Sequence, residues 1–266
     1  KSSLINRLAG KPRSIVSDVA GTTRDSIDVD VDYNGDVYTF VDTAGVRKRQ
    51  KVEAGSEWLM VNRALKSVRR SDVVLLLIDA TDGVRDQDRT LAARIAEEGR
   101  ACVVVVNKWD AVEKDDSTFS KAVSYVEENL PAVGRWAKPV FISALTGQRC
   151  DKIYDAVKSA ARQHRRRIPT AILNEVIRDA VMWQPPPKTN QKQGRIYYAN
   201  QISTAPPTIV LFCNDPSAFG DGYKRYLDRK FRENLGFEGS PIRWVWRGKK
   251  LRAAKKEFVS KKPHAG

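Results

Sequence analysis

Residues 101–110 read ACVVVVNKWD, an apolar run that ends in the polar motif Asn-Lys-x-Asp. A continuous valine-rich run of this length predicts a buried strand over 101–107. The motif then lies at the carboxyl end of that strand, where ligands collect in open α/β sheets. The Asp110 carboxylate can accept hydrogen bonds from both N1–H and the exocyclic amine of guanine, a pair of donors that adenine does not offer. This stretch therefore predicts an α/β fold with a guanine site.

Three further motifs stand at positions where the same ligand could be reached. Val41-Asp42-Thr43-Ala44-Gly45 ends another apolar strand; its carboxylate can hold a Mg²⁺-bound water, and its glycine lets the backbone approach a γ-phosphate. Ser143-Ala144-Leu145 follows a third strand, and Lys1-Ser2-Ser3 reads as the end of a G-x-x-x-x-G-K-[ST] phosphate loop. Each motif alone could be an ordinary loop, but four in this order favour one shared nucleotide.

The first portion of the chain alternates short β-branched runs with amphipathic stretches, which predicts a mostly parallel sheet covered on both faces. Asn34-Gly35 lies between two of the runs and predicts a hairpin, because both of its positions tolerate a positive φ. The predicted strands are 27–33, 37–41, 73–79, 101–107 and 139–142, and the predicted helices are 57–70, 86–99, 118–130 and 149–164.

The pattern changes at Arg165-Arg166-Arg167-Ile168-Pro169, where we place a domain boundary. The order beyond it is helix, strand, strand, helix, strand, which is typical of a small two-layer α+β unit. The predicted domains are therefore 1–168, 169–246 and a basic tail, 247–266. The elements of the second are a helix over 170–182, strands at 195–202 and 208–213, a helix over 219–235 and a strand at 241–246.

Composition excludes several classes of protein. The chain has 266 residues but two histidines, His164 and His264, too few for an imidazole-based triad or a His-rich metal site. Its three cysteines form no C-x-x-C pair, which argues against a zinc ribbon and a disulfide framework. No apolar run reaches the roughly 18 residues of a membrane span. The chain starts at Lys1 rather than Met, so we expect a further segment upstream.

The net charge of +15 is concentrated in the second portion. Residues 169–266 hold 18 Lys/Arg and 8 Asp/Glu, a net +10, against +5 for residues 1–168. Such asymmetry predicts a polyanionic partner such as RNA. Aromatic residues lie among these charges and fit either RNA contact or core packing: Tyr197, Tyr198, Tyr223, Tyr226, Trp244 and Trp246. We interpret the G-x-x-G at 236–239 as a helix end followed by a turn rather than as a phosphate clamp, because it precedes a strand and contains Glu238.

The order K-S, G-T-T, D-T-A-G, N-K-x-D and S-A-L resembles a GTP-binding domain of the translation-factor class. The stretches 19–25 (VAGTTRD), 62–65 (NRAL) and 70–75 (RSDVVL) narrow the resemblance to the Der/EngA family. The resemblance implies a P-loop GTPase domain followed by a KH-like domain, and an activity in assembly of the large ribosomal subunit. It covers nearly the whole chain, and it implies a first GTPase domain that is absent here.

The resemblance also implies roles for individual residues. Lys1 is expected to contact the β- and γ-phosphates, Ser2 to ligate Mg²⁺, Asp42 to bind Mg²⁺ through water, and the Gly45 amide to sense the γ-phosphate. Asn107 and Asp110 are expected to read guanine, with the Lys108 stem along the base and the Ser143–Leu145 loop supporting O6. Of the paired Thr22 and Thr23, Thr23 is preferred as the second Mg²⁺ ligand, and the assignment stays open. Lys1, Thr23 and Gly45 are the expected catalytic set. The full set expected to bind GTP or GDP is Lys1, Ser2, Ser3, Thr22, Thr23, Asp42, Thr43, Ala44, Gly45, Val46, Asn107, Lys108, Trp109, Asp110, Ser143, Ala144 and Leu145.

Val46 stands where enzymes of the Ras class carry the glutamine that orients the attacking water. The valine side chain has no hydrogen-bonding group, so hydrolysis must be organised in some other way. The resemblance suggests a K⁺ ion near the phosphates; Arg24 is a weaker alternative, as an arginine finger in cis.

Two other functions remain open from the sequence. One is a GTP-binding assembly factor that binds rRNA and does not hydrolyse the nucleotide; the intact Asp42 and Thr22-Thr23 argue against it. The other is a metabolic or transport ATPase, against which Asp110 argues. The preferred prediction is a monomeric GTPase whose partner is a large-subunit precursor and its rRNA. It would act in the bacterial cytoplasm, or in the chloroplast stroma if the protein is organellar.

Overall fold

The computed structural model of this chain describes residues 2–10, 28–41, 65–189 and 192–248. The chain divides into two compact units. The first consists of residues 1–167 together with 203–207 and 235–243, and the second consists of 168–202, 208–234 and 244–266. No helix in the described residues has the length and apolar character to cross a bilayer.

The first unit is built on a parallel sheet of the predicted kind. Its strands β3 (Val73–Asp79), β4 (Ala101–Asn107) and β5 (Pro139–Phe141) lie in the order β3-β4-β5. In the register of β3 and β4, the last residue of one strand lies opposite the last residue of the other, Asp79 against Asn107. The carboxyl ends of these two strands are therefore level, so the loops that leave them begin side by side.

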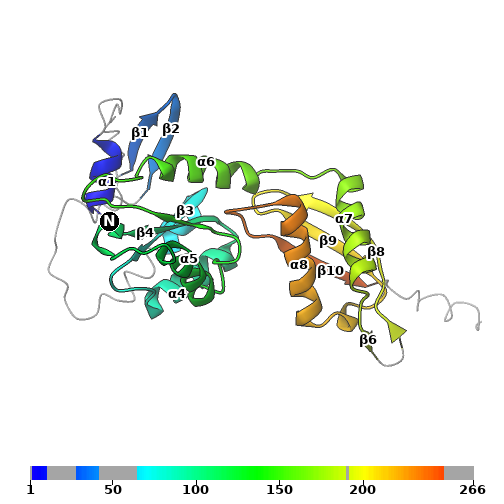
Figure 1. Cartoon of the computed structure of the whole chain (residues 1–266). Coiled ribbons are helices and arrows are strands. Elements are labelled where there is room, and N and C mark those ends of the chain that lie inside the picture. Colours follow the sequence, from blue (N-terminus) through cyan, green and yellow to red (C-terminus); the bar gives the residue numbers. More distant parts are fainter. Residues whose placement is uncertain (1, 11–27, 42–64, 190–191, 249–266) are drawn as a thin grey trace, which may run out of the picture. The chain divides into compact units, whose positions relative to one another are not determined.

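Strand β4 is buried on both faces, which explains why its sequence is apolar throughout rather than alternating. One set of its side chains packs against α4 (Asp86–Glu98) and α5 (Thr118–Asn129). The other set packs against α1 (Ser2–Ala9) and α6 (Lys152–His164), and Figure 1 shows α6 on the opposite side of the sheet from α4 and α5. The first set is Cys102, Val104 and Val106; the second is Ala101, Val103 and Val105.

The predicted hairpin is confirmed as β1 (Val29–Tyr33) and β2 (Asp36–Phe40), an antiparallel pair. Asn34 and Gly35 join the strands with φ values of 55° and 82°, the backbone that the Asn-Gly pair favours. Of the helix predicted over 57–70, residues 65–70 are helical and the rest lies outside the described residues.

The second unit has the predicted α+β order. Its helices α7 (Thr170–Trp183) and α8 (Asp221–Leu235) accompany a sheet of order β10-β9-β8, and a short hairpin of β6 (Lys188–Thr189) and β7 (Lys192–Gln193) was not predicted. The strands of the sheet are β8 (Ile196–Ser203), β9 (Thr208–Cys213) and β10 (Arg243–Gly248).

Four of the six aromatic residues noted in the sequence serve the packing of helix α8. The Trp244 ring meets Phe231 edge-on at 4.9 Å, and its Nε1 donates to Asp228 at 2.9 Å. Trp246 lies 4.7 Å from Phe219, which precedes the helix. Tyr223 and Tyr226 are buried, and each hydroxyl donates to a backbone carbonyl at or just beyond the end of α7.

The G-x-x-G stretch at 236–239 is folded into the first unit. The Phe237 side chain is fully buried, and the Gly239 carbonyl accepts a hydrogen bond of 2.9 Å from the Cys102 N–H at the start of β4. Nearby, His164 is buried with its Nδ1 2.9 Å from the Ser240 hydroxyl. Phe237 and Gly239 are thus buried packing positions, whereas Gly236 and Glu238 are exposed, which agrees with the interpretation of the stretch as a helix end followed by a turn.

Candidate guanine-nucleotide site

The Asn107–Asp110 motif leaves the sheet at the carboxyl end of β4, where neighbouring strands hold its backbone. The Ala80 N–H, just after β3, donates to the Asn107 carbonyl at 2.8 Å. The Trp109 N–H donates to the Ile142 carbonyl, just after β5, at 3.0 Å. Between them Lys108 takes a left-handed φ of 64°. These contacts fix the course of the backbone that presents the Lys108 and Asp110 side chains to solvent.

The Asn107 side chain joins two of the predicted base-contacting segments. Its Oδ1 accepts a hydrogen bond of 2.9 Å from the Ala144 N–H. Because Ala144 lies in the loop after β5, this bond sets the distance between the Asn-Lys-x-Asp motif and the Ser143–Leu145 loop. A carboxamide is suited to this position because it offers an acceptor on one atom and donors on the other.

The Ser143–Leu145 loop is held from within. Ser143 is fully buried; its Oγ accepts from the Thr146 N–H at 3.1 Å, and its carbonyl accepts from the Gly147 N–H at 2.9 Å. Leu145, by contrast, is 77% exposed. The loop thus buries Ser143 and Ala144 and exposes Leu145.

Lys108 forms an ion pair with Asp79 that the sequence did not reveal. Its Nζ lies 2.6 Å from Oδ2 of Asp79, the last residue of β3, while the Asp79 Oδ1 accepts from both the N–H and the hydroxyl of Thr81. Burial raises the pKa of the Asp79 carboxyl, but the hydrogen bonds from Lys108 and Thr81 outweigh it and lower the pKa to about 2. The pair holds the end of the Lys108 side chain at the carboxyl end of β3.

Helix α1, which follows the predicted phosphate loop in sequence, is tied to the Ser143–Leu145 loop. The Arg7 Nε donates to the Ala144 carbonyl at 3.4 Å, and its Nη2 donates to the Leu145 carbonyl. Leu4 and Leu8 anchor the helix in the core, and the Tyr154 hydroxyl donates to the Leu8 carbonyl at 3.2 Å. Arg7 therefore links helix α1 to the Ser143–Leu145 loop.

Comparison with known proteins agrees with this geometry. Residues 1–108 match the model of the 50S ribosome-binding GTPases, and residues 167–247 match that of the KH-domain-like region at the C-terminus of EngA bacterial GTPases. The chain is 53% identical to GTPase Der of a Cyanothece species over 260 residues, 97% of this chain and 57% of the relative. It is 52% identical to GTPase Der of Gloeobacter violaceus over 266 residues, 99% of this chain and 58% of the relative.

Over its own length, the chain belongs to the Der/EngA family of GTPases. It spans about 57% of the length of these curated relatives. Among solved structures it resembles Era of Aquifex aeolicus bound to GDP and AlF₄⁻, with a TM-score of 0.45 and 22% identity over 92% of this chain and 87% of that one. A likeness at that level carries no argument about function.

Part of the site expected from Der/EngA membership lies outside the described residues. This holds for Lys1, the Ser2 side chain, the Thr22-Thr23 pair and the segment 42–46. Ser3 is described and exposed. Within the described ranges, no group of three His, Cys, Asp or Glu side chains is placed to hold a metal ion. The Mg²⁺ ligands predicted for this family therefore stay predictions.

The structure brings together Asn107, Lys108 and the Ser143–Leu145 loop. It directs the Trp109 side chain away from them. The Trp109 side chain is 8% exposed and lies 4.4 Å from the Phe141 ring in the core below the motif. Any contact from this residue to a nucleotide would have to come from its backbone. Sequence reasoning missed Asp79 and Arg7; Asp79 had a signal, since an acidic residue ends a strand otherwise made of Val, Leu and Ile.

Proposed function

We propose that this protein binds GTP through the Asn107–Asp110 motif and the Ser143–Leu145 loop and hydrolyses it to GDP and phosphate. The observation that carries the proposal is the hydrogen bond from the Ala144 N–H to Asn107 Oδ1, which joins two segments of unrelated sequence at one edge of the sheet. Asp110 reads N1–H and the exocyclic amine of guanine. The Ser143–Leu145 loop supports O6.

Roles at the phosphate end follow from the family pattern. Lys1 contacts the β- and γ-phosphates, Gly45 senses the γ-phosphate through its amide, and Ser2, Asp42 and one of the paired threonines, preferably Thr23, hold Mg²⁺. The ion neutralises charge that develops on the phosphate oxygens. The Val46 side chain cannot orient the attacking water. We therefore assign that role to a group other than a glutamine side chain, and a bound K⁺ ion is the hypothesis to test.

We further propose that the hydrolysis cycle serves assembly of the large ribosomal subunit and that the precursor's rRNA is the direct partner. Two things support this. The family model matched by residues 1–108 is described as ribosome-binding, and residues 169–266 carry a net charge of +10. A γ-phosphate can bias such binding only through contacts that it makes in one state and not in the other. We therefore expect the affinity for precursors to differ between the GTP and GDP states.

Phosphate release by the full-length protein tests the catalytic proposal and separates it from the non-hydrolysing alternative. With Mg²⁺ and GTP we expect turnover that is faster in K⁺ than in Na⁺ at matched ionic strength. Equal rates in both salts would rule out the K⁺ hypothesis alone. Tight GTP binding with no phosphate release in either salt, alone or with large-subunit precursors, would instead favour the non-hydrolysing assembly factor.

A further inference from the structure

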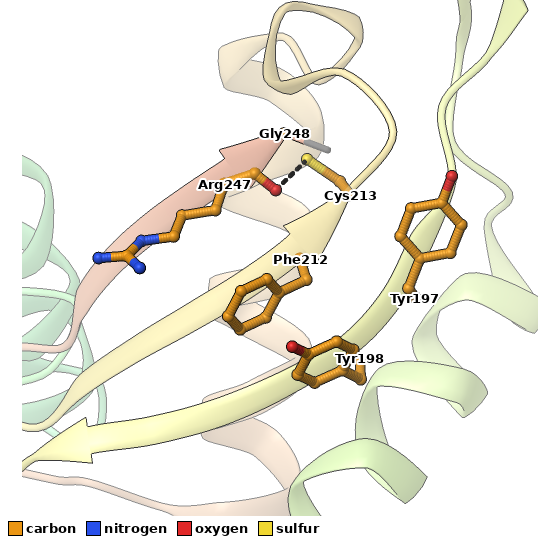
Figure 2. Close-up of a pocket in the computed structure, with 6 residues that line it drawn as sticks. All are labelled: Tyr197, Tyr198, Phe212, Cys213, Arg247 and Gly248. Atoms are coloured by element: carbon orange, nitrogen blue, oxygen red, sulfur yellow. Dashed lines mark hydrogen bonds between the residues drawn. The ribbon is translucent and has the colours of Figure 1, made fainter. Parts of the chain in front are cut away.

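The second unit has a hollow of about 310 Å³ beside its sheet. That volume lies at the lower end of the range for small-ligand pockets, about 300–1,000 Å³. Figure 2 shows the residues that line it, which come from strands β8, β9 and β10. They are Tyr197, Tyr198, Phe212, Cys213, Arg247 and Gly248.

Two of these residues form a flat aromatic surface. The rings of Tyr198 and Phe212 are stacked, with centroids 4.2 Å apart and planes inclined by 13° (Figure 2). Tyr198 is 48% exposed even so, and it lines the hollow. Tyr197, next along β8, is 52% exposed and points away from the stack (Figure 2).

Tyr198 differs from four other aromatic residues of this unit in remaining 48% exposed. Trp244 and Trp246 are packed at α8 or at the residue that precedes it, and Tyr223 and Tyr226 are buried. A buried stack would be explained by core packing. An exposed one keeps apolar ring surface in water, which is typical of a surface that binds something.

Positive charge begins at the same hollow. The Cys213 thiol donates to the Arg247 carbonyl at 3.5 Å, and this contact helps to place Arg247 and Gly248 at the rim. From Arg247 to the end of the chain the sequence has eight Lys/Arg and one Glu. A flat apolar ring that lines the same hollow as Arg247 complements a ligand with a flat base and an anionic backbone. An apolar peptide would gain nothing from the charge.

We propose that Tyr198, stacked on Phe212, is a platform for an unpaired base of single-stranded RNA, and that Arg247 contacts an adjacent phosphate. The inference rests on the proposed rRNA partner and names the site on the second unit that would bind it. Stacking tolerates any base, because every base has a π-face. The platform therefore adds affinity for unpaired RNA without reading a sequence.

The first test compares three variants in binding to a fluorescein-labelled, mixed-sequence, single-stranded RNA. Tyr198→Leu should weaken binding on the order of 5- to 100-fold, the range expected when one base–aromatic stack is removed. Tyr198→Phe keeps the ring and should stay within about twofold of the wild type. Trp183→Leu is the matched control, because Trp183 is 83% exposed on the same unit and does not line the hollow.

Salt dependence separates the two interactions. In a plot of log affinity against log salt concentration, Arg247→Gln should make the slope shallower by the contribution of about one phosphate contact. Tyr198→Leu should lower the affinity at every salt concentration and leave the slope unchanged. Binding of a blunt RNA duplex should be insensitive to Tyr198→Leu, because its bases are not available for stacking.

A measurement on the wild-type protein avoids the effect of a variant that folds poorly. Photocrosslinking of the wild-type protein to single-stranded RNA containing 4-thiouridine should modify the peptide with Tyr198 or Phe212. Crosslinks that map only elsewhere, or equal affinities for Tyr198→Leu and wild type, would overturn the platform while the rRNA partner stands. If the wild type binds neither the oligonucleotide nor large-subunit precursors, both proposals fail. If Tyr198→Leu loses precursor binding but keeps RNA binding, the hollow binds a protein instead.

Discussion

At the residue scale, the candidate site contains two kinds of side chain. Some are held by partners within the protein, and one faces solvent. Asn107 is engaged by the Ala144 N–H and Lys108 by Asp79, so both are held within the protein. Asp110 is exposed just beyond β4. We therefore assign positioning to Asn107 and Asp79, and base recognition to Asp110.

Asp110→Asn should change which nucleotide is bound. In the proposed site the wild-type carboxylate accepts from the N1–H and exocyclic amine of guanine, whereas an asparagine amide can donate to the O2 of xanthine. We expect affinity for GTP to fall on the order of 100-fold and affinity for xanthosine triphosphate to rise, measured by competition with a fluorescent nucleotide. Asp116→Asn, also exposed and six residues further on, is the control and should change neither. An unchanged preference in Asp110→Asn would remove the guanine-reading assignment.

Asp79→Asn should lower stability at neutral pH and not at very low pH. The folded-state pKa of Asp79, about 2, is below its ordinary value of 3.8. The carboxylate therefore contributes its stabilisation fully above 3.8 and loses it as pH falls toward 2. Because Lys108 is largely exposed, we expect a loss of at most about 1 kcal/mol at pH 7.

Urea unfolding of Asp79→Asn and wild type between pH 7 and pH 2 measures this difference. The two curves should converge as the pH approaches 2. Asp82→Asn, which removes an exposed pair with Arg85 and leaves the Asp79–Lys108 pair in place, is the control. A difference for Asp79→Asn that stays constant across this range would show that the ion pair with Lys108 is not its source.

At the scale of elements, strand β4 organises the first unit. Its two faces meet two helical layers, and its carboxyl end carries the Asn107–Asp110 motif. Its amino end is joined to residues 235–243, which arrive from much later in the sequence, through the hydrogen bond between Cys102 and Gly239. The Gly239 carbonyl thus satisfies a strand N–H at the start of β4.

Gly239→Ala should destabilise the first unit strongly. Gly239 has a φ of 75°, and a Cβ there would lie 2.5 Å from the Ala160 Cβ and 3.0 Å from its Cα. We expect a loss of about 3 kcal/mol, of which about 1 is backbone strain and the rest steric overlap with α6. Urea unfolding of the variant measures it.

Gly35→Ala is the matched control, since Gly35 has a similar φ of 82° with nothing within 4 Å of the added Cβ. It should cost about 1 kcal/mol, the strain alone. Equal losses at Gly35 and Gly239 would mean that the Ala160 side chain relaxes and that the packing of residues 235–243 tolerates a larger side chain.

At the scale of the whole molecule, charge and chemistry are divided between the units. Residues 1–168 hold the candidate nucleotide site and a net charge of +5, whereas residues 169–266 hold +10. Residues 247–266 contribute most of the latter, with eight Lys/Arg and one Glu. We expect this segment to act on a polyanion rather than on the nucleotide.

Removal of residues 249–266 should weaken binding to large-subunit rRNA and flatten its salt dependence. The deletion removes seven Lys/Arg and one Glu. Each phosphate that is no longer neutralised by a cation reduces the slope of log affinity against log salt by about 0.7–0.9. We expect a slope smaller by about two or more, measured by filter binding between about 50 and 200 mM salt. A segment of the same composition in scrambled order should restore the slope; an unchanged slope after the deletion would assign the charge to solubility.

The sequence by itself determined the fold class, the order of the main elements and the guanine motif. These are local properties: valine runs specify buried strands, Asn34-Gly35 specifies its turn, and Asn-Lys-x-Asp is contiguous. Only the tertiary structure decided which groups meet across the chain. It paired Lys108 with Asp79 and Arg7 with the Ala144 and Leu145 carbonyls. It also separated the aromatic residues, leaving Tyr198 exposed and packing Trp244 against Phe231. Alternation along a strand places such side chains on one face or the other, but the helix that covers a face is known only once the chain has folded.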